Sequence, residues 1–295
     1  MEEEDEREKT VAVMVLYHPE LDFLEKNLKA ITPQVGKVYI IDNTPEGDLS
    51  GWNCLESKHA YFPLKRNLGI AAAQNIGIRY AAEEGVDLIY FLDQDSLSPA
   101  GIIENLKACR HRLLEKNIKV GAVGACPINR QNGEAYQGKK GGREKEMLCC
   151  EVAELISSGS LISTKTFQDT GCMEEDLFID LVDHEWCWRA KAKGDYRHFI
   201  DLTTELNHQI GGGDRRLLWK KVAMPSPFRI YYLYRNVILM SGRDYVENKW
   251  KFINLVKLGL KIFYYPVFIS PRKVYARNII RGIRDGIRGL RRTLK

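Results

Sequence analysis

The chain has 295 residues, of which 44% are hydrophobic, and a formal net charge of +5. This length and composition suffice for one large buried core, or for a core with a smaller appended region, and they exclude disorder of the whole chain. The acidic, polar start excludes a secretory signal of the usual basic and apolar kind, so we expect a cytoplasmic protein.

Charge is concentrated at both ends of the chain. Residues 1–9 carry six acidic side chains against Arg7 and Lys9, a composition that predicts a disordered tail. Residues 272–295 carry nine Lys or Arg side chains against one Asp, which indicates an anionic surface as a partner. The seven cysteines include no CxxC pair, so free thiols in a reducing compartment are expected.

The first 95 residues alternate between apolar strands and helices. Short apolar runs at 11–16, 38–41 and 87–92 predict strands buried on both faces. Leu and Ile recur every three or four residues over 21–31 and predict a helix, and the alanine-rich segment 70–82 predicts another. This order predicts an α/β fold with right-handed crossovers and a mainly parallel, Rossmann-like sheet.

Polar side chains follow each of the three predicted strands, at the sheet edge where ligands bind in such folds. They are Tyr17 after the first strand, Asp42 and Asn43 after the second, and Asp93, Gln94 and Asp95 after the third. The sequence therefore predicts a nucleotide site at this edge. Farther along, residues 131–146 are rich in Gly and Lys and predict a loop or hairpin tip, and the chain from about Leu217 looks helical.

Asp93 and Asp95 place two carboxylates one residue apart at a strand end. Mg²⁺ and Mn²⁺ prefer oxygen ligands and often bind through one or two carboxylates together with substrate phosphates. A helix N-cap would explain Asp95, because Ser96 and Pro99 follow it, but not the second carboxylate. The spacing favours a metal site and leaves the cap open.

Two more segments carry candidate groups. Residues 64–77 combine small side chains with Asn67, Gly69 and Asn75, which suits close approach to a phosphate or base; tight packing of a helix on the sheet is the alternative. Residues 178–189 place several acidic side chains among aromatic residues, where burial can raise a carboxyl pKa to suit a general base. The alternative for this segment is a surface helix with solvent-facing acids.

These segments, in this order, resemble the family 2 glycosyltransferases, and residues 10–215 resemble the bacterial rhamnosyltransferase branch of that family. The matching segments are LYHPE, IIDNT, RNLGIAAAQNIGI, FLDQDS, SSGSLIS, LFIDLVDHEWCWRA and HQIGG. The resemblance implies a GT-A fold over 10–215, with a nucleotide-sugar half at 10–100 and an acceptor-binding half at 101–215. A helical, basic region at 216–295 would follow.

The resemblance also implies a role for each candidate residue. Asp93 and Asp95 match the Asp-x-Asp motif that holds Mg²⁺ or Mn²⁺, with His208 near the metal or the diphosphate. Donor binding falls on Tyr17, Asp42, Asn43, Asn67, Gly69, Asn75 and Gln94. Asp183 matches the catalytic base, and Asp180, Glu185, Trp186 and Arg189 fall to the acceptor or its sugar. Val182 stands where many relatives have an acidic residue, so that acidic pair is incomplete.

The activity implied is an inverting, metal-dependent transfer of rhamnose from dTDP-L-rhamnose to a hydroxyl of a cell-surface glycan, lipid-linked during its assembly. Another donor, such as a UDP-hexose or a galactofuranose donor, stays open. A sugar nucleotidyltransferase is a remoter alternative, since it would carry a Gly-rich, basic phosphate loop where this chain has Tyr17 to Glu20. No nucleic-acid partner is expected, and homo-oligomerisation stays open.

The carboxyl-terminal arm has apolar residues every three or four positions from Ala276 to Leu294, with Arg between them. This pattern predicts an amphipathic helix with a basic face. Residues 252–269 are apolar, but Lys257, Lys261 and Pro266 make them a poor bilayer span. We therefore predict a peripheral enzyme held by the arm on the inner face of the cell membrane. Docking of the arm on the catalytic domain or on a second subunit is the alternative.

Overall fold

The computed structural model describes residues 8–129, 143–144, 148–208, 214–217, 220–223 and 225–293. Its strands are β1 (Thr10–Leu16), β2 (Lys37–Asp42), β3 (His59–Pro63), β4 (Leu88–Asp93), β5 (Ser96–Leu97), β6 (Val120–Asn129), β7 (Arg143–Glu144), β8 (Cys149–Val152), β9 (Ser160–Ser163), β10 (Arg197–His208), β11 (Asp214–Leu217) and β12 (Lys220–Ala223). Its helices are α1 (Leu21–Ile31), η1 (Thr32–Gln34), α2 (Ile70–Glu83), α3 (Ile102–Glu115), α4 (Thr164–Thr170), η2 (Glu175–Leu177), α5 (Val182–Gly194), α6 (Pro227–Ser241), α7 (Asn248–Phe268) and α8 (Arg272–Thr293).

One mixed sheet runs through the α/β domain, by which we mean β1–β10 with α1–α5. Its strand order is β3-β2-β1-β4-β9-β6-β10-β8-β7, with β5 paired to β10. The pairs β3–β2, β2–β1, β1–β4 and β6–β10 are parallel, whereas β9 runs antiparallel between β4 and β6. The mainly parallel sheet expected from the sequence is therefore confirmed, with β9, β8 and β5 reversed.

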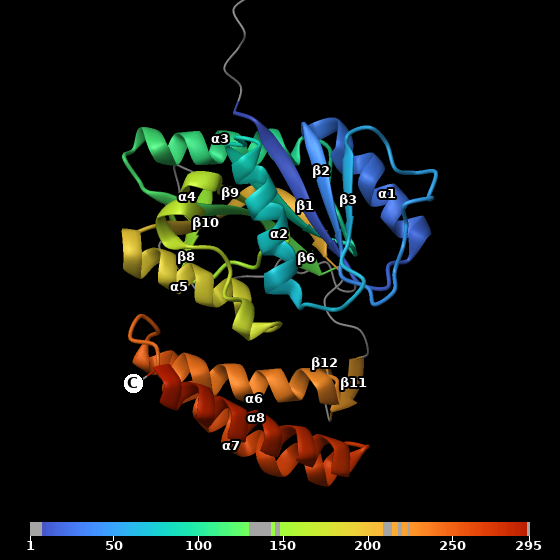
Figure 1. The fold of residues 1–295 in the computed structure, drawn as a ribbon. Coiled ribbons are helices and arrows are strands. Elements are labelled where there is room, and N and C mark those ends of the chain that lie inside the picture. The colour runs from blue at the N-terminus through green and yellow to red at the C-terminus, as the bar shows by residue number, and fades with distance from the viewer. Residues whose placement is uncertain are drawn as a thin grey trace, which may run out of the picture.

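Helices cover both faces of this sheet because its central strands are apolar on both sides. Along β1, Val11, Val13 and Val15 pack with α2, α4 and α5, while Ala12, Met14 and Leu16 pack with α1 and α3. Every residue of β1 is buried. The carboxyl ends of β1, β2 and β4 point toward the three helices α6–α8, which we call the helical layer (Figure 1).

The predicted elements of the first 95 residues are present, with one addition. β3 forms the edge of the sheet, and all five of its residues are only half-buried, so it lacks the continuous apolar run that identifies the central strands. The predicted tail at 1–9 needs a correction at its end, because Glu8 pairs with Arg110 at 2.7 Å and the Lys9 amide donates to Asp87 at 2.8 Å. Residues 1–7 lie outside the described part.

The region after the α/β domain is not helical from its start. β11 and β12 pair antiparallel, and among the described residues of this region the helices begin only at Pro227. The predicted hairpin tip at 131–146 lies outside the described residues except for β7. None of the seven cysteines, all of which are described, forms a disulfide.

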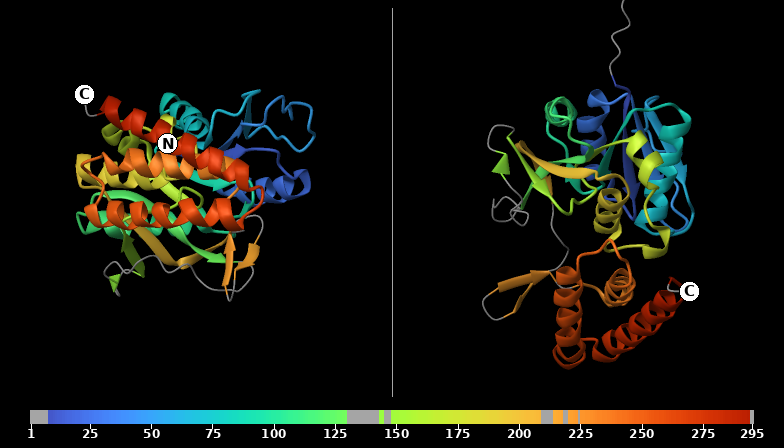
Figure 2. Two further views of the ribbon diagram at one scale, coloured as in Figure 1. Left: turned by 90° about the horizontal axis from the view of Figure 1, so that it is seen from below. Right: turned by 90° about the vertical axis from the view of Figure 1, so that its left-hand side faces the viewer.

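The helical layer is attached to the α/β domain mainly through α6. The buried Asn236 side chain donates to the carbonyls of Leu177, Ile179 and Asp180 at 3.0, 2.7 and 2.9 Å. The side view at the right of Figure 2 shows α6 between the sheet and the outer pair α7 and α8. Because Asn236 satisfies three carbonyls of one turn, the conformation of residues 177–180 depends on α6.

The amphipathic helix predicted near the carboxyl terminus is present as α8, and part of its apolar stripe is covered. Tyr275 and Ile279 are buried in a cluster with Ile230, Tyr234 and Val237 of α6. Gly282 and Gly286 face the α6 backbone so closely that a Cβ would lie 2.6 and 3.0 Å from its carbonyl oxygens. The docking alternative therefore holds for this part of the stripe, whereas Ile280 and Ile287 of α8 remain exposed. Across the described residues, no helix combines the length and hydropathy that a bilayer span needs.

Candidate active site

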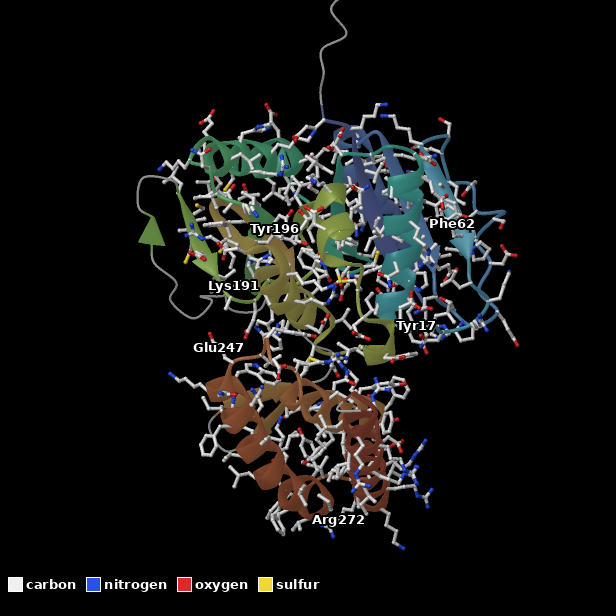
Figure 3. The ribbon with its side chains drawn as sticks, turned by 60° about the vertical axis from the view of Figure 1, so that its left-hand side comes forward. Tyr17, Phe62, Lys191, Tyr196, Glu247 and Arg272 are labelled. Carbon is white, nitrogen blue, oxygen red and sulfur yellow. The ribbon has the colours of Figure 1, made fainter. Side chains whose placement is uncertain are left out.

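The carboxyl ends of β1, β2 and β4 lie side by side and bring the predicted polar residues together. Leu16 pairs with Asp42, and Val15 pairs with Asp93. Gln94 then joins the two loops, because its Oε1 accepts from the Tyr17 amide at 2.7 Å and its Nε2 donates to the Tyr17 carbonyl at 3.1 Å. Tyr17 itself stays exposed, and Figure 3 places it at the edge of the α/β domain that faces the helical layer.

Two of the predicted donor-binding residues support the walls of this site instead of lining it. Asp42 is 1% exposed, and its two oxygens accept from the Tyr61 hydroxyl at 2.6 Å and the Thr44 amide at 3.0 Å. Asn75 is also buried and is bonded to Met173 through both its amide group and its carbonyl oxygen. The predicted direct donor contact is therefore corrected for these two, which fix the loops that follow β2 and α4.

Asn43, Asn67 and Gly69 form one linked group after β2. The Asn43 amide donates to Asn67 Oδ1 at 3.0 Å, and the same oxygen accepts from the Gly69 backbone at 2.9 Å. Gly69 has a φ of +85°, and a Cβ there would lie 2.6 Å from the carbonyl oxygen of Phe178. The next amide, of Ile70, donates to that carbonyl at 2.7 Å. Gly69 thus permits the donor-side loop to touch the segment that precedes α5.

Gly69→Ala is expected to destabilise the protein by about 1–3 kcal/mol and to weaken donor use, because the loop must move away from Phe178. The urea midpoint and the donor KM measure the two effects. Gly85→Ala is the matched control, since Gly85 also has a positive φ, of +65°, but has open space around it. Equal losses in both variants would mean that backbone strain alone matters and that the contact with Phe178 does not.

Asp93 and Asp95 flank the turn between β4 and β5. The Asp95 carboxylate is half-buried and, within the described part of the chain, makes no hydrogen bond or ion pair. β5 pairs antiparallel with β10 so that the His208 backbone lies opposite Ser96, next to Asp95. The side chain of His208 lies outside the described residues, and the described ones contain no group of three metal-binding side chains. The carboxylate oxygens of Asp93 and Asp95 are ligands of the kind that Mg²⁺ and Mn²⁺ prefer.

Asp183 lies in the first turn of α5, and a short serine segment connects it to Asp93. Its Oδ2 accepts from the Ser157 amide at 3.4 Å, and its Oδ1 accepts from the His184 amide at 3.0 Å. The neighbouring Ser158 hydroxyl accepts from the Asp93 amide at 3.1 Å. One dipeptide therefore contacts both carboxylate-bearing residues and brings the candidate base and the candidate metal site to the same edge.

Glu185, Trp186 and Arg189, which follow Asp183 on α5, do not line the cavity described below. Glu185 is 0% exposed and binds Arg189 through Nε at 2.7 Å and Nη2 at 2.9 Å. Arg189 also donates to the Thr170 and Cys172 carbonyls, and the indole of Trp186 donates to the Gly171 carbonyl at 3.2 Å. The predicted acceptor role is corrected for these three, because their polar atoms are buried and bonded within the protein.

Asp180 is also engaged with the protein. It has a φ of +63°, its carboxylate pairs with Arg229 of α6, and its carbonyl accepts from Asn236. The hydrogen bond to Asp180 raises the pKa of the Arg229 guanidinium, so this ion pair persists at neutral pH. Asp180 therefore holds α6 against the α/β domain and is corrected from an acceptor ligand to a residue of this contact.

A cavity of about 530 Å³ opens beside Asp183, between the α/β domain and the start of α7. Its apolar walls include Leu155, Trp188, Trp250 and Ile253, and its polar groups include Glu154, His184, Glu247 and Lys249. The rings of Trp188 and Trp250 meet edge to face at 4.8 Å. Figure 3 shows Glu247 where the helical layer meets the α/β domain. The cavity thus offers aromatic surface together with hydrogen-bonding groups.

Two groups of residues in this site were not predicted from the sequence. Ser157 and Ser158 belong to the SSGSLIS segment, whose small polar residues before a strand were the available signal. Trp250, Glu247 and Lys249 reach the cavity only because α6 carries the chain back over α5. No local sequence pattern predicts that α6 brings these residues back over α5.

Comparison with known proteins places this geometry in a family. No protein-family model matches the chain. A dTDP-rhamnosyl transferase of Shigella flexneri, RfbF, is 31% identical over 291 residues, and the match covers 95% of each chain. Among solved structures, the S. aureus TarS fragment 1–349 in complex with UDP-GlcNAc matches with a TM-score of 0.54, at 15% identity, over 96% of this chain and 81% of that one.

GalNAc-T7 with UDP, GalNAc and Mn²⁺ matches with a TM-score of 0.56 at 13% identity. That match covers 82% of this chain, which spans about half of the GalNAc-T7 chain, at 54%. At these identities the two structures show the fold, which is the GT-A fold, while the relative from Shigella flexneri shows the family. The chain is an enzyme of the family 2 glycosyltransferases and belongs to their rhamnosyltransferase branch.

Proposed function

We propose that this protein transfers rhamnose from dTDP-L-rhamnose to a hydroxyl group of a glycan acceptor, with inversion at the anomeric carbon. The donor is supported by the name of the relative that matches over 95% of the chain. The observation that carries the reaction is the serine dipeptide: Ser157 contacts Asp183 and Ser158 contacts Asp93, beside an open cavity. A single displacement with a nucleoside diphosphate as the leaving group needs a general base and a site that stabilises the leaving group's charge. Asp183 and the Asp93–Asp95 pair, which lie at one edge, would supply the two.

Asp93 and Asp95 would hold a divalent cation, with His208 as a third ligand from β10. The half-buried Asp95 carboxylate and the register of His208 against Ser96 support this assignment. A bound Mg²⁺ or Mn²⁺ neutralises the charge that develops on the departing diphosphate. Tyr17 and Gln94 are bonded to each other at the same edge and would contact the nucleotide.

Asp183 would act as the general base. Both of its oxygens accept backbone hydrogen bonds, which fixes the carboxylate next to His184, a residue that lines the cavity. From there it would take the proton from an acceptor hydroxyl as that oxygen attacks the anomeric carbon. The acceptor sugar would sit in the cavity, where Trp188 and Trp250 supply ring faces and His184 and Glu154 supply polar atoms 4.0 Å apart. The mixed walls suit an amphipathic, lipid-linked glycan.

Nucleotide release from dTDP-rhamnose should require Mg²⁺ or Mn²⁺ and fall to background in excess chelator, because two carboxylates repel an unneutralised diphosphate. We would incubate the purified protein with dTDP-rhamnose, UDP-glucose, UDP-galactose and UDP-galactofuranose and measure nucleotide release with each. Release is expected to be fastest with dTDP-rhamnose. Faster release from a UDP sugar would replace the proposed donor, and full activity in chelator would remove the proposed metal.

Asp95→Ala tests the location of the metal in the same assay. It is expected to abolish metal-dependent donor binding, measured by calorimetry with and without Mn²⁺. Asp22→Ala is the control, since Asp22 is an exposed carboxylate in the first turn of α1 and removes the same charge elsewhere. Unchanged donor affinity in Asp95→Ala would place the metal at another site.

A further inference from the structure

One face of α7 is apolar and exposed to solvent. Its members recur every three or four residues, are between 47% and 74% exposed, and are Phe252, Val256, Leu260, Phe263 and Val267. The opposite side of the helix is apolar too, and there Leu258 and Tyr265 are buried against α6 and α8. A helix that is apolar on both sides normally has a partner on both sides.

The apolar face of α7 runs into a basic corner where α7 meets α8. Phe268 is 69% exposed at the end of α7, and the exposed side chains of Arg272, Lys273 and Arg277 begin α8. Figure 3 places Arg272 at the extreme end of the helical layer, away from the sheet, and the view from below in Figure 2 shows α7 and α8 lying over that side of the molecule. We call α7's exposed face together with this corner the α7–α8 surface.

Charge identifies the partner of the α7–α8 surface. Residues 248–295 carry 13 Lys or Arg side chains, and Asp285 is their single acidic residue. Two copies of such a surface would repel each other, so a symmetric dimer through it is disfavoured. The partner must be negatively charged, to match the basic side chains, and must accept aromatic side chains a few ångströms below its surface, to cover the apolar face of α7. An anionic lipid bilayer has that chemistry.

We propose that the α7–α8 surface binds the interface of an anionic membrane, with Phe252, Leu260 and Phe263 entering the acyl boundary and the basic side chains of the corner contacting lipid headgroups. The larger apolar share of this role falls to α7, because Tyr275 and Ile279 of α8 are already buried against α6 and leave only Ile280 and Ile287 of its predicted stripe among the exposed large apolar side chains. The helical layer would then stand between the membrane and the sheet edge that carries Asp93 and Asp183 (Figure 1).

The first test is co-sedimentation of the full chain with vesicles of phosphatidylcholine alone or with 30 mol% phosphatidylglycerol, an amount of about a third chosen to give a strong surface charge. The protein is expected to pellet with the anionic vesicles and to be released in part as salt rises. The triple variant Phe252→Ser, Leu260→Ser, Phe263→Ser should bind at least about tenfold more weakly, because it loses the side chains that leave water.

Two control variants distinguish binding by the α7–α8 surface from nonspecific apolar or electrostatic binding by the α/β domain. Leu114→Ser, Leu148→Ser, Leu202→Ser removes three exposed apolar side chains of the α/β domain and should bind as the unaltered chain does. Arg272→Gln, Lys273→Gln, Arg277→Gln should weaken binding on the order of a hundredfold, since each basic side chain contributes about fivefold. Lys26→Gln, Lys58→Gln, Lys116→Gln removes as many exposed charges from the α/β domain and should change binding little.

Light scattering of the chain in solution completes the test. A monomer that binds anionic vesicles and loses binding in the α7 variant supports the proposal. A dimer that the α7 variant dissociates, with no vesicle binding by the unaltered chain, would overturn it in favour of a second copy. Binding that is indifferent to lipid charge, or equal in the α7 variant and its control, would also overturn it. No donor or acceptor enters these measurements, so their failure leaves the proposed reaction untouched.

Discussion

Asp183→Asn is expected to lower the turnover of rhamnosyl transfer at least about a hundredfold, the usual effect of removing a positioned general base. The amide has the shape of the carboxylate and can keep the hydrogen bond from the Ser157 or the His184 amide, but it cannot take the proton of the attacking hydroxyl. Donor affinity should stay within about twofold, because Asp183 acts on the acceptor side. Transfer rate and calorimetric donor binding measure the two quantities separately.

Asp180→Asn is the comparison for this variant. Asp180 lies three residues away, but its carboxylate pairs with Arg229, so we expect at most a small loss of turnover and a modest loss of stability. A large loss of turnover in Asp180→Asn, with near-normal turnover in Asp183→Asn, would move the base to Asp180. Loss of donor affinity in Asp183→Asn would instead show that Asp183 supports the donor site.

Glu185→Gln is expected to lower the free energy of unfolding by about 3–5 kcal/mol, because it leaves the buried Arg189 guanidinium without its counter-charge. Glu185 is fully buried, and it also accepts from the Tyr245 hydroxyl at 2.7 Å. Burial, and then the Glu185 carboxylate, raise the pKa of Tyr245, so this hydroxyl remains a donor at neutral pH. The urea midpoint, measured with an unchanged m-value, reports the loss.

Two further variants make this result specific. Glu25→Gln breaks an exposed pair with Lys29 at the same i, i+4 spacing and should cost less than about 1 kcal/mol. The double variant Glu185→Leu, Arg189→Met removes both buried charges and should recover part of the stability. A Glu185→Gln protein with normal stability but weakened acceptor binding would restore the acceptor role that its burial argues against.

The central strands and first helices were predictable because their signal is local. β1, β2 and β4 are continuous apolar runs, and α1 has its apolar residues at helical spacing, so each element identifies its own buried side. The polar residues at the strand ends were predictable for the same reason, since parallel strands must end at one edge. β3 was missed because a half-buried edge strand lacks such a run.

The roles of the α5 side chains were not predictable, because they depend on partners far away in sequence. Glu185 differs little from Asp183 as a residue type, yet Glu185 is fully buried and bonded to Tyr245, 60 residues later, while Asp183 is only half-buried and accepts from backbone amides. The same holds for α8. Its pattern correctly predicted an amphipathic helix, but only the packing of Tyr275, Ile279 and the two glycines Gly282 and Gly286 on α6 shows that part of its apolar stripe is covered. Periodicity identifies an apolar face and does not identify what covers it.

The three hydrogen bonds of Asn236 limit how this chain can be recombined with its relatives. They fix the turn that leads into α5, and therefore the start of the helix that carries Asp183. Consider a chimera that keeps the α/β domain of this chain but takes α6–α8 from another transferase. The cavity walls formed here by Glu247 and Trp250 would then come from the other transferase. The chimera would remain active only if the incoming helix also supplied an amide at position 236. Exchange of acceptor preference between these enzymes is thus constrained by one buried side chain that never meets the substrate.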